Sequence, residues 1–157
     1  MEFSEKSKQK LQEILSHYPT KTSAVLPVIY IAQEEFGYLS NEVIEYLSKL
    51  LNISPVFLKN TISFYTMYKQ KEIGKYLIQV CHTLSCSLMG ASSILEHIKM
   101  KLNIDVGETT SDKNFSVIKV ECLGSCDTAP VMRINNDYYE NLTKEKIDEI
   151  LDKLRNS

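Results

Sequence analysis

Two segments, IQVCHTLSC at 78–86 and VECLGSC at 120–126, share one design and bear most directly on the fold. In each, an apolar run typical of a β-strand leads to a cysteine, and a second cysteine follows a few residues later. The chain has four cysteines, Cys81 with Cys86 at C-x₄-C spacing and Cys122 with Cys126 at C-x₃-C spacing. Sites in α/β layers form where strands end, so both pairs lie where a site is expected.

The composition is that of an ordinary globular chain. It has 157 residues, of which 43% are hydrophobic and 24% charged, with a net charge of −2. Nucleic-acid-binding proteins are normally basic, so the charge does not favour a nucleic-acid partner. The longest apolar stretch, 24–32, is too short to cross a bilayer, and residues 1–10 lack the apolar segment of a signal peptide. We therefore expect a soluble cytoplasmic protein, in which clustered cysteines serve metal or redox chemistry rather than disulfides.

Residues 1–74 are predicted to form a helical domain. Apolar residues recur at helical spacing, Pro19 and Gly37 end two of the segments, and Ser40 and Ser54-Pro55 begin two others. The expected helices cover 11–18, 23–36, 40–51 and 54–68. The aromatic run FYTMY at the end of the fourth is expected to be mostly core.

Residues 75–157 are predicted to form an α/β domain, after a charged boundary segment that contains Gly74. The expected order is strand 76–81, helix 90–102, strand 115–121, short strands near 131–134 and 137–140, and helix 144–155. The first three elements make a βαβ unit, which implies a parallel strand pair. The predicted fold class is α+β, an N-terminal helical bundle followed by a thioredoxin-like α/β domain.

The spacing of the cysteines leaves two metal sites open. Matching pairs at strand ends argue against unrelated buried thiols, the compartment argues against a disulfide, and the C-x-x-C of thiol exchange does not occur. Zinc takes four thiolates, most often as C-x₂-C pairs, whereas a [2Fe–2S] cluster takes two thiolates on each iron and suits wider loops. Cys86 is expected just before a helix starting near Gly90, whose dipole favours a thiolate, and Gly124 should bring amides close to sulfur.

Histidine ligands are not expected. Rieske centres place two histidines on one iron, which requires a histidine near both halves of the site. Only His82 adjoins a cysteine, while His97 lies mid-helix and His17 lies in the helical half. We interpret all three as ordinary surface or partly buried residues.

Longer motifs narrow the choice of family. They are FYTMY at 64–68, IQVCHTLSCSLMGA at 78–91, GETTSD at 107–112, VECLGSCDTAPVMRINNDYYENLT at 120–143, and FGYLS at 36–40. Together they resemble the NuoE family, the thioredoxin-like [2Fe–2S] subunit of the NADH-quinone oxidoreductase known as respiratory complex I. The resemblance covers essentially the whole chain and implies one [2Fe–2S] cluster with the ligands Cys81, Cys86, Cys122 and Cys126.

The resemblance also implies a function and partners. It implies an electron-transfer subunit of an oxidoreductase, with FMN and NADH on a NuoF-like flavoprotein and a larger, NuoG-like iron–sulfur subunit nearby, in the peripheral arm of a membrane-associated complex. Small [2Fe–2S] subunits of NAD-linked hydrogenases and formate dehydrogenases share the motif and form the alternative. A zinc-stabilised interaction module is the alternative from a different class.

The chain itself lacks the pattern of a nucleotide site. Its five glycines are far apart and no G-x-G occurs, so the turn that cradles phosphates is not expected here. We therefore expect the isolated chain to be an electron carrier. A free ferredoxin would need only the residues after Gly74, so the helical half is expected to dock on the flavoprotein.

Overall fold

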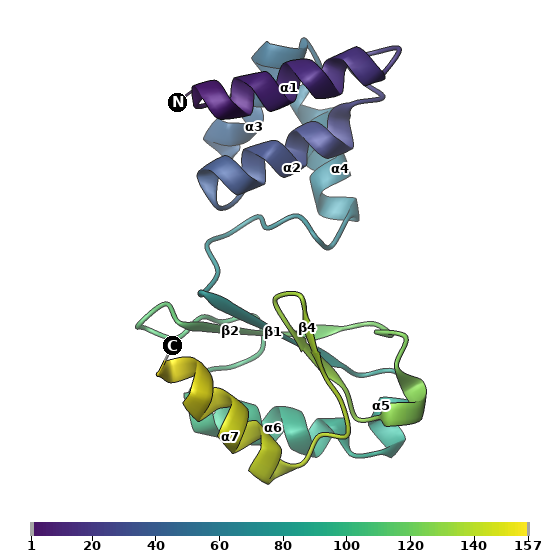
Figure 1. The fold of residues 1–157 in the computed structure, drawn as a ribbon, viewed down its shortest axis with the longest axis vertical. Helices are drawn as coiled ribbons and strands as arrows, with labels where there is room; N and C mark the ends of the chain where they lie inside the picture. The colour runs from purple at the N-terminus through teal and green to yellow at the C-terminus, as the bar shows by residue number, and fades with distance from the viewer. Residues whose placement is uncertain (1, 157) are drawn as a thin grey trace. The chain divides into compact units, whose positions relative to one another are not determined.

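The computed structural model describes residues 2–156 and divides into two compact units between Glu72 and Ile73. The first unit is helical and the second is a mixed helix and sheet layer, each drawn in Figure 1. The predicted fold class is therefore confirmed. The boundary predicted from the sequence lies between Gly74 and Lys75. None of the helices in residues 2–156 combines the length and the hydropathy that crossing a bilayer requires.

The helical unit consists of four short amphipathic helices that share one core. The helices are α1 (Glu5–His17), α2 (Val25–Phe36), α3 (Asn41–Leu51) and α4 (Pro55–Phe64). Side-chain caps begin two of them, because Ser4 accepts from the Ser7 amide and Ser40 accepts from the Val43 amide. Val28, Leu47 and Leu58 are completely buried at the centre of this core. The unit thus buries its own apolar stripes by packing helix on helix.

Helix α4 is shorter than the sequence pattern predicts. It was expected to continue to residue 68, but it ends at Phe64, and the next residues form a turn in which the Tyr68 amide donates to the Tyr65 carbonyl over 3.1 Å. Leaving the helix lets Tyr68 reach α2, where its hydroxyl donates to the Leu26 carbonyl over 2.9 Å. Tyr68 is buried, but Phe64 is 76% exposed and Met67 is 47% exposed. The prediction that this run is mostly core is wrong for those two residues.

The α/β unit is built on a four-stranded sheet in the order β2-β1-β3-β4. The strands are β1 (Tyr76–Cys81), β2 (Phe115–Val120), β3 (Met132–Ile134) and β4 (Asp137–Tyr139). As predicted, β1 and β2 are parallel, whereas β3 and β4 form an antiparallel hairpin beside β1. Helices α6 (Ala91–Leu102) and α7 (Lys144–Arg155) cover one face of this sheet (Figure 1). Their inner residues complete a core with Ile78, Phe115 and Met132.

The connection from β1 to β2 contains a second helix that the sequence does not predict. This helix, α5 (Leu84–Leu88), has five residues and precedes α6. Gly90 separates the two helices with a backbone φ of 93°, a left-handed conformation that glycine adopts readily. Consequently Cys86 lies inside α5 and not ahead of the first turn of the longer helix.

Gly74 fixes the start of the α/β unit. Its amide donates to the buried Ser116 hydroxyl over 2.7 Å, and that hydroxyl also pairs with the Thr109 hydroxyl at 2.7 Å. A Cβ at Gly74 would lie 2.8 Å from backbone atoms of Asn114 and Phe115. The chain can therefore approach the start of β2 this closely only because residue 74 has no side chain.

Gly74→Ala is expected to lower the free energy of unfolding of the α/β unit by about 1–3 kcal/mol, because the added methyl group would have to displace backbone. Chemical denaturation followed by circular dichroism measures this change. Glu149→Ala, on the exposed side of α7, is the control and should stay within about 0.5 kcal/mol of the unsubstituted chain. Equal unfolding midpoints for the two variants would contradict the role of Gly74.

Candidate metal centre

Parallel pairing places the two cysteine pairs at one edge of the sheet. The register aligns Cys81, the last residue of β1, with Val120, the last residue of β2. The chain leaves both strands in the same direction, so the loops that carry the remaining cysteines begin side by side. β3 lies on the other side of β1, where Val131 accepts from the Cys81 amide over 3.2 Å.

The first pair is buried. Cys81 and Cys86 are each 2% exposed and pack in a small apolar cluster with Ala91, Ala129 and Val131. Thr83 is the N-cap residue of α5, and its hydroxyl lies 3.2 Å from the Cys81 sulfur. Because α5 carries Cys86 on its inner side, this short helix brings the second thiol back to the first.

The second pair lies in an exposed loop, residues 122–126, which we call the second cysteine loop. The sulfurs of Cys122 and Cys126 are 3.7 Å apart. Gly124 has a backbone φ of 80°, and its amide donates to the Cys122 sulfur over 3.3 Å. The prediction that this glycine brings an amide to sulfur is confirmed. A 3₁₀ turn, Cys126–Thr128, follows the loop.

Hydroxyl groups between the cysteines connect the two pairs. The Thr83 side chain interacts with the thiol of Cys122 as well as with that of Cys81. The Ser85 side chain reaches the Cys126 thiol. These contacts make one site of four thiols. The sequence pattern did not single out either hydroxyl residue, although each lies between the first two cysteines in the motif CHTLSC.

The environments of the first pair favour ionisation of one thiol over the other. Burial opposes the thiolate of Cys81, but hydrogen bonds from the Thr83 side chain and from the Thr83 and Leu123 amides outweigh it and lower the pKa. Burial raises the pKa of Cys86, and the neighbouring Cys81 adds to that rise. The start of a helix thus supports a thiolate at Cys81, through α5, and not at Cys86 as predicted.

The second pair shows the same asymmetry with less burial. The Gly124 amide lowers the pKa of Cys122, with help from the side chains of Cys126 and Thr83. The pKa of Cys126 is raised, first by its hydrogen bond to Cys122 and then by the charge of that neighbour. Each pair therefore holds one thiol that ionises early and one that ionises late.

The spacing of the sulfurs fits thiolate ligation in pairs. Two thiolates bound about 2.3 Å from a tetrahedral metal lie about 3.8 Å apart, and the sulfurs of Cys122 and Cys126 are separated by 3.7 Å. Within residues 2–156, no three His, Cys, Asp or Glu side chains converge as a single metal ion requires. A binuclear [2Fe–2S] cluster needs two thiolates on each iron, which is the arrangement these pairs offer.

The histidines have partners of their own. The Nδ1 atom of His82 lies 2.7 Å from the Val120 carbonyl oxygen, and its Nε2 atom lies 3.8 Å from the Glu121 carboxylate. His97 pairs across the helices with Asp148 at 3.0 Å. The sequence interpretation of these residues as ordinary agrees with these contacts.

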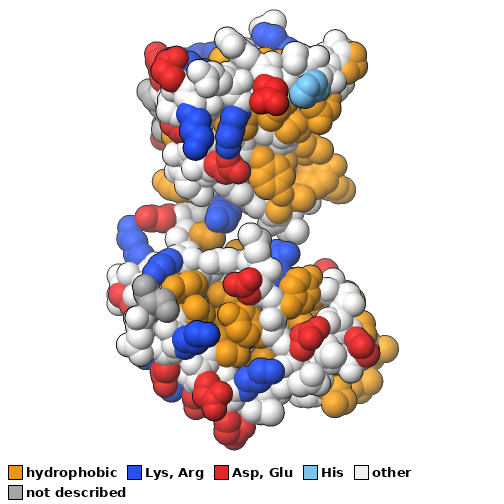
Figure 2. All heavy atoms as spheres, in the orientation of Figure 1, with side chains coloured by type: hydrophobic (Ala, Val, Ile, Leu, Met, Phe, Trp, Pro, Cys, Tyr) orange, Lys and Arg blue, Asp and Glu red, His pale blue; other side chains and the backbone are white. Residues whose placement is uncertain are grey.

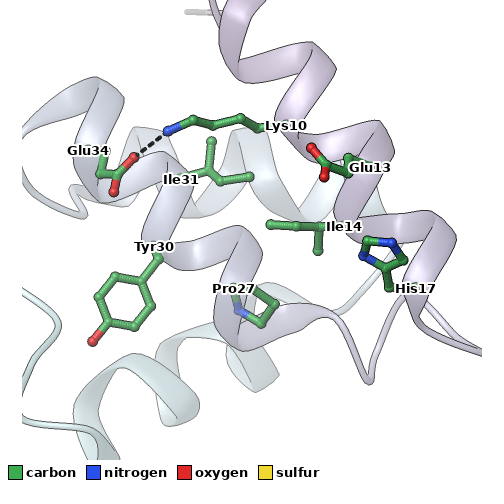
Figure 3. Close-up of a pocket in the computed structure, with 8 residues that line it drawn as sticks. All are labelled: Lys10, Glu13, Ile14, His17, Pro27, Tyr30, Ile31 and Glu34. Atoms are coloured by element: carbon green, nitrogen blue, oxygen red, sulfur yellow. Dashed lines mark hydrogen bonds and ion pairs between the residues drawn. The ribbon is translucent and has the colours of Figure 1, made fainter.

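A shallow groove of about 350 Å³ lies between α1 and α2 of the helical unit (Figure 3). Ile14, Pro27 and Ile31 line it with apolar surface. At one end Lys10 and Glu34 form an ion pair with an N–O distance of 3.0 Å. Because its lysine is already neutralised and its lining is mostly apolar, the groove offers no ready site for a phosphate group.

A thioredoxin-like layer that brings two pairs of thiols to the ends of adjacent parallel strands is the framework of an iron–sulfur protein. Residues 11–155 match the family described as thioredoxin-like [2Fe–2S] ferredoxin. The chain belongs to this family, and the resemblance found in the sequence is confirmed.

Relatives of the chain extend over nearly its full length. It is 41% identical to a NuoE-type chain of the NADH-quinone oxidoreductase of Rickettsia conorii, over 98% of this chain and 94% of the relative. It is 37% identical to the mitochondrial NADH dehydrogenase [ubiquinone] flavoprotein 2 of Dictyostelium discoideum, over 99% of this chain and 64% of that protein. The fold also matches the crystal structure of an NAD⁺-reducing [NiFe]-hydrogenase in the H₂-reduced state, with a TM-score of 0.74 and 23% identity, over 85% of this chain and 22% of that one.

In the metal-free, reduced chain, iodoacetamide is expected to modify Cys122 before Cys126. Both thiols are exposed, but the lowered pKa of Cys122 leaves a larger fraction of it as the reactive thiolate near pH 7.5. Mass spectrometry of peptides after a brief anaerobic reaction measures the two rates. The chain unfolded in denaturant is the control, where the two rates should converge. Faster modification of Cys126 in the folded chain would contradict the geometry of the loop.

Proposed function

We propose that Cys81, Cys86, Cys122 and Cys126 ligate one [2Fe–2S] cluster and that residues 1–74 and 75–157 are separate domains, of which the second carries the cluster. The observation that carries this proposal is the meeting of two thiol pairs at the ends of β1 and β2. The chain's membership of a [2Fe–2S] family supports iron over zinc at this site. When bound, such a cluster accepts and returns single electrons.

The residues around the thiols have a clear task in this centre. Amides of Thr83, Leu123 and Gly124 point at sulfur and stabilise its negative charge. Helix α5 keeps water from the first pair, since both of its thiols are buried. Hydrogen bonding to sulfur and burial are the two means by which a protein tunes such a centre.

The proposed activity is electron transfer within an NADH dehydrogenase module, as in the relatives that are named as parts of an NADH-quinone oxidoreductase. The chain would exchange electrons with FMN on a NuoF-like flavoprotein that also binds NADH, beside a NuoG-like iron–sulfur subunit in the peripheral arm of a respiratory complex. An NAD-linked hydrogenase or formate dehydrogenase stays the alternative, because its small subunit is expected to share the cysteine motif. The proteins that co-purify with the chain would distinguish these complexes.

Replacing any one of the four cysteines by serine is expected to remove or strongly alter the cluster, because each iron needs two thiolates. The unsubstituted chain should contain about two irons and two sulfides and no stoichiometric zinc. Visible absorption with iron and sulfide analysis measures both expectations.

His82→Ala is the matched control, since its ring contacts Val120 and Glu121 instead of a thiol. It should keep its full iron content. Loss of the cluster in this variant, to the extent seen with Cys81→Ser, would contradict the all-cysteine assignment. One zinc per chain without sulfide would favour the zinc-stabilised interaction module.

Two exposed apolar surfaces support association with a partner. On α5, Leu84 is 75% exposed and Leu88 is 78% exposed, directly outside the buried Cys86. Figure 2 shows hydrophobic side chains gathered at the α5 edge of the α/β unit, and a second group along α2 and α4 of the helical unit. The second group includes Tyr30, Phe57 and Phe64. Exposed apolar surface next to a redox centre suits a contact across which electrons pass.

Leu88→Asp is expected to weaken binding of the iron-loaded chain to its NADH-oxidising flavoprotein by roughly tenfold to hundredfold, the loss expected for one buried leucine side chain. Phe64→Asp tests the helical unit in the same way. Calorimetry measures the affinity, and the NADH-driven loss of visible absorption measures electron transfer.

Met100→Asp is the control, because Met100 is an equally exposed apolar residue on α6. If Leu88→Asp and Phe64→Asp both bound as well as Met100→Asp, neither surface would serve this partner. NADH alone should leave the absorption unchanged, and bleaching without the flavoprotein would contradict the assignment of nucleotide chemistry to the partner.

A further inference from the structure

The second cysteine loop is attached to the end of the β3–β4 hairpin by two side chains. The Tyr138 hydroxyl donates to the Leu123 carbonyl over 3.1 Å. The Ser125 hydroxyl donates to the Glu140 carboxylate and also lies 2.9 Å from the Thr128 hydroxyl. Both contacts reach residues that lie between the two cysteines of the loop, one near each end.

The segment that supplies these side chains is itself held in place. The Asn141 amide donates to the Thr128 carbonyl over 2.7 Å, and the Leu142 amide donates to the Pro130 carbonyl over 3.1 Å. Lys146, in the first turn of α7, donates to the Glu140 carbonyl over 2.6 Å. The hairpin end is therefore a fixed support, while the loop that it holds contributes no side chain to the fully buried core.

The loop needs such a support because packing alone does not define it. Cys122 and Cys126 are exposed, and Gly124 allows many backbone conformations. The first pair, in contrast, is fixed by burial between α5 and β1. The 3.7 Å separation of the second pair thus depends on polar contacts to its loop.

Glu140 also places a negative charge beside the loop. Hydrogen bonds from Ser125 and Thr128 lower the pKa of its carboxyl group more than burial raises it, so the carboxylate stays ionised at neutral pH. Reduction of an iron–sulfur centre adds a negative charge, and a nearby carboxylate opposes that change by repulsion.

We propose that Tyr138 and Glu140 are positioning residues of the metal centre: together they set the second cysteine loop, and the charge of Glu140 lowers the reduction potential of the bound cluster. The effect on the potential rests on the proposed [2Fe–2S] function, whereas the effect on the loop is a property of the folded chain alone.

The first test uses the metal-free, full-length chain. Tyr138→Phe and Glu140→Ala should each reduce the preference of iodoacetamide for Cys122 over Cys126 severalfold, because the loop loses a fixed contact. Asp137→Asn is the matched control: it removes an exposed carboxylate from the same hairpin, at a residue paired with Ile134 on β3. An unchanged preference in both loop variants would overturn the positioning role.

The second test uses the iron-loaded, full-length chain and measures the midpoint potential by titration with dithionite. Glu140→Gln keeps the shape and removes the charge, so its potential should become more positive, by more than that of Asp137→Asn. Equal shifts in these two variants would overturn the electrostatic role. A lower unfolding midpoint with unchanged potential and thiol preference would mark a purely structural role and also overturn the proposal. If the unsubstituted chain held no iron, the proposed function would fail, and the thiol test would still decide the role in the loop.

Discussion

The parallel pairing of β1 with β2 is the constraint on which the metal centre depends. It aligns Cys81 with Val120, so that the two strands end level and their loops leave the sheet together. A register shift of one residue would turn each inward side chain outward, which the buried Ile78, Val80 and Val117 prevent. The core of the α/β unit therefore specifies the position of the site, although none of those three residues belongs to it.

Within that frame the two thiol pairs solve the crowding of negative sulfur differently. The first pair is buried, and the cost of charge there is offset by the start of α5 and by backbone amides directed at Cys81. The second pair is exposed, so water shares in stabilising its charge, and what the protein must supply is geometry. This difference explains why packing surrounds Cys86, whereas hydrogen bonds to Tyr138 and Glu140 hold the loop of Cys122 and Cys126.

The sequence predicts what depends on local pattern and fails where tertiary contacts decide. The four cysteines, the parallel strands and the caps Ser40 and Thr143 all follow from short motifs and are present in the structure. Helix α5 is too short to show a hydrophobic period, and it exists because Cys86 is buried. The end of α4 likewise depends on Tyr68, whose partner Leu26 lies 42 residues earlier in the chain. Support of the second cysteine loop by Glu140 involves a separation of 15 residues and has no local signal.

The helical unit raises a separate question, because it has a complete core of its own. Ile29, Leu47 and Ile62 are fully buried without any contribution from residues after Glu72. Its remaining exposed apolar side chains, such as Val56 and Phe64, are therefore not needed to hold the unit together. Single exposed apolar residues are normal, but several on α2 and α4 combine with those on α5, outside the thiols. Since each core is already satisfied, both surfaces are best explained as contacts that become buried when the chain joins the other proteins of its complex.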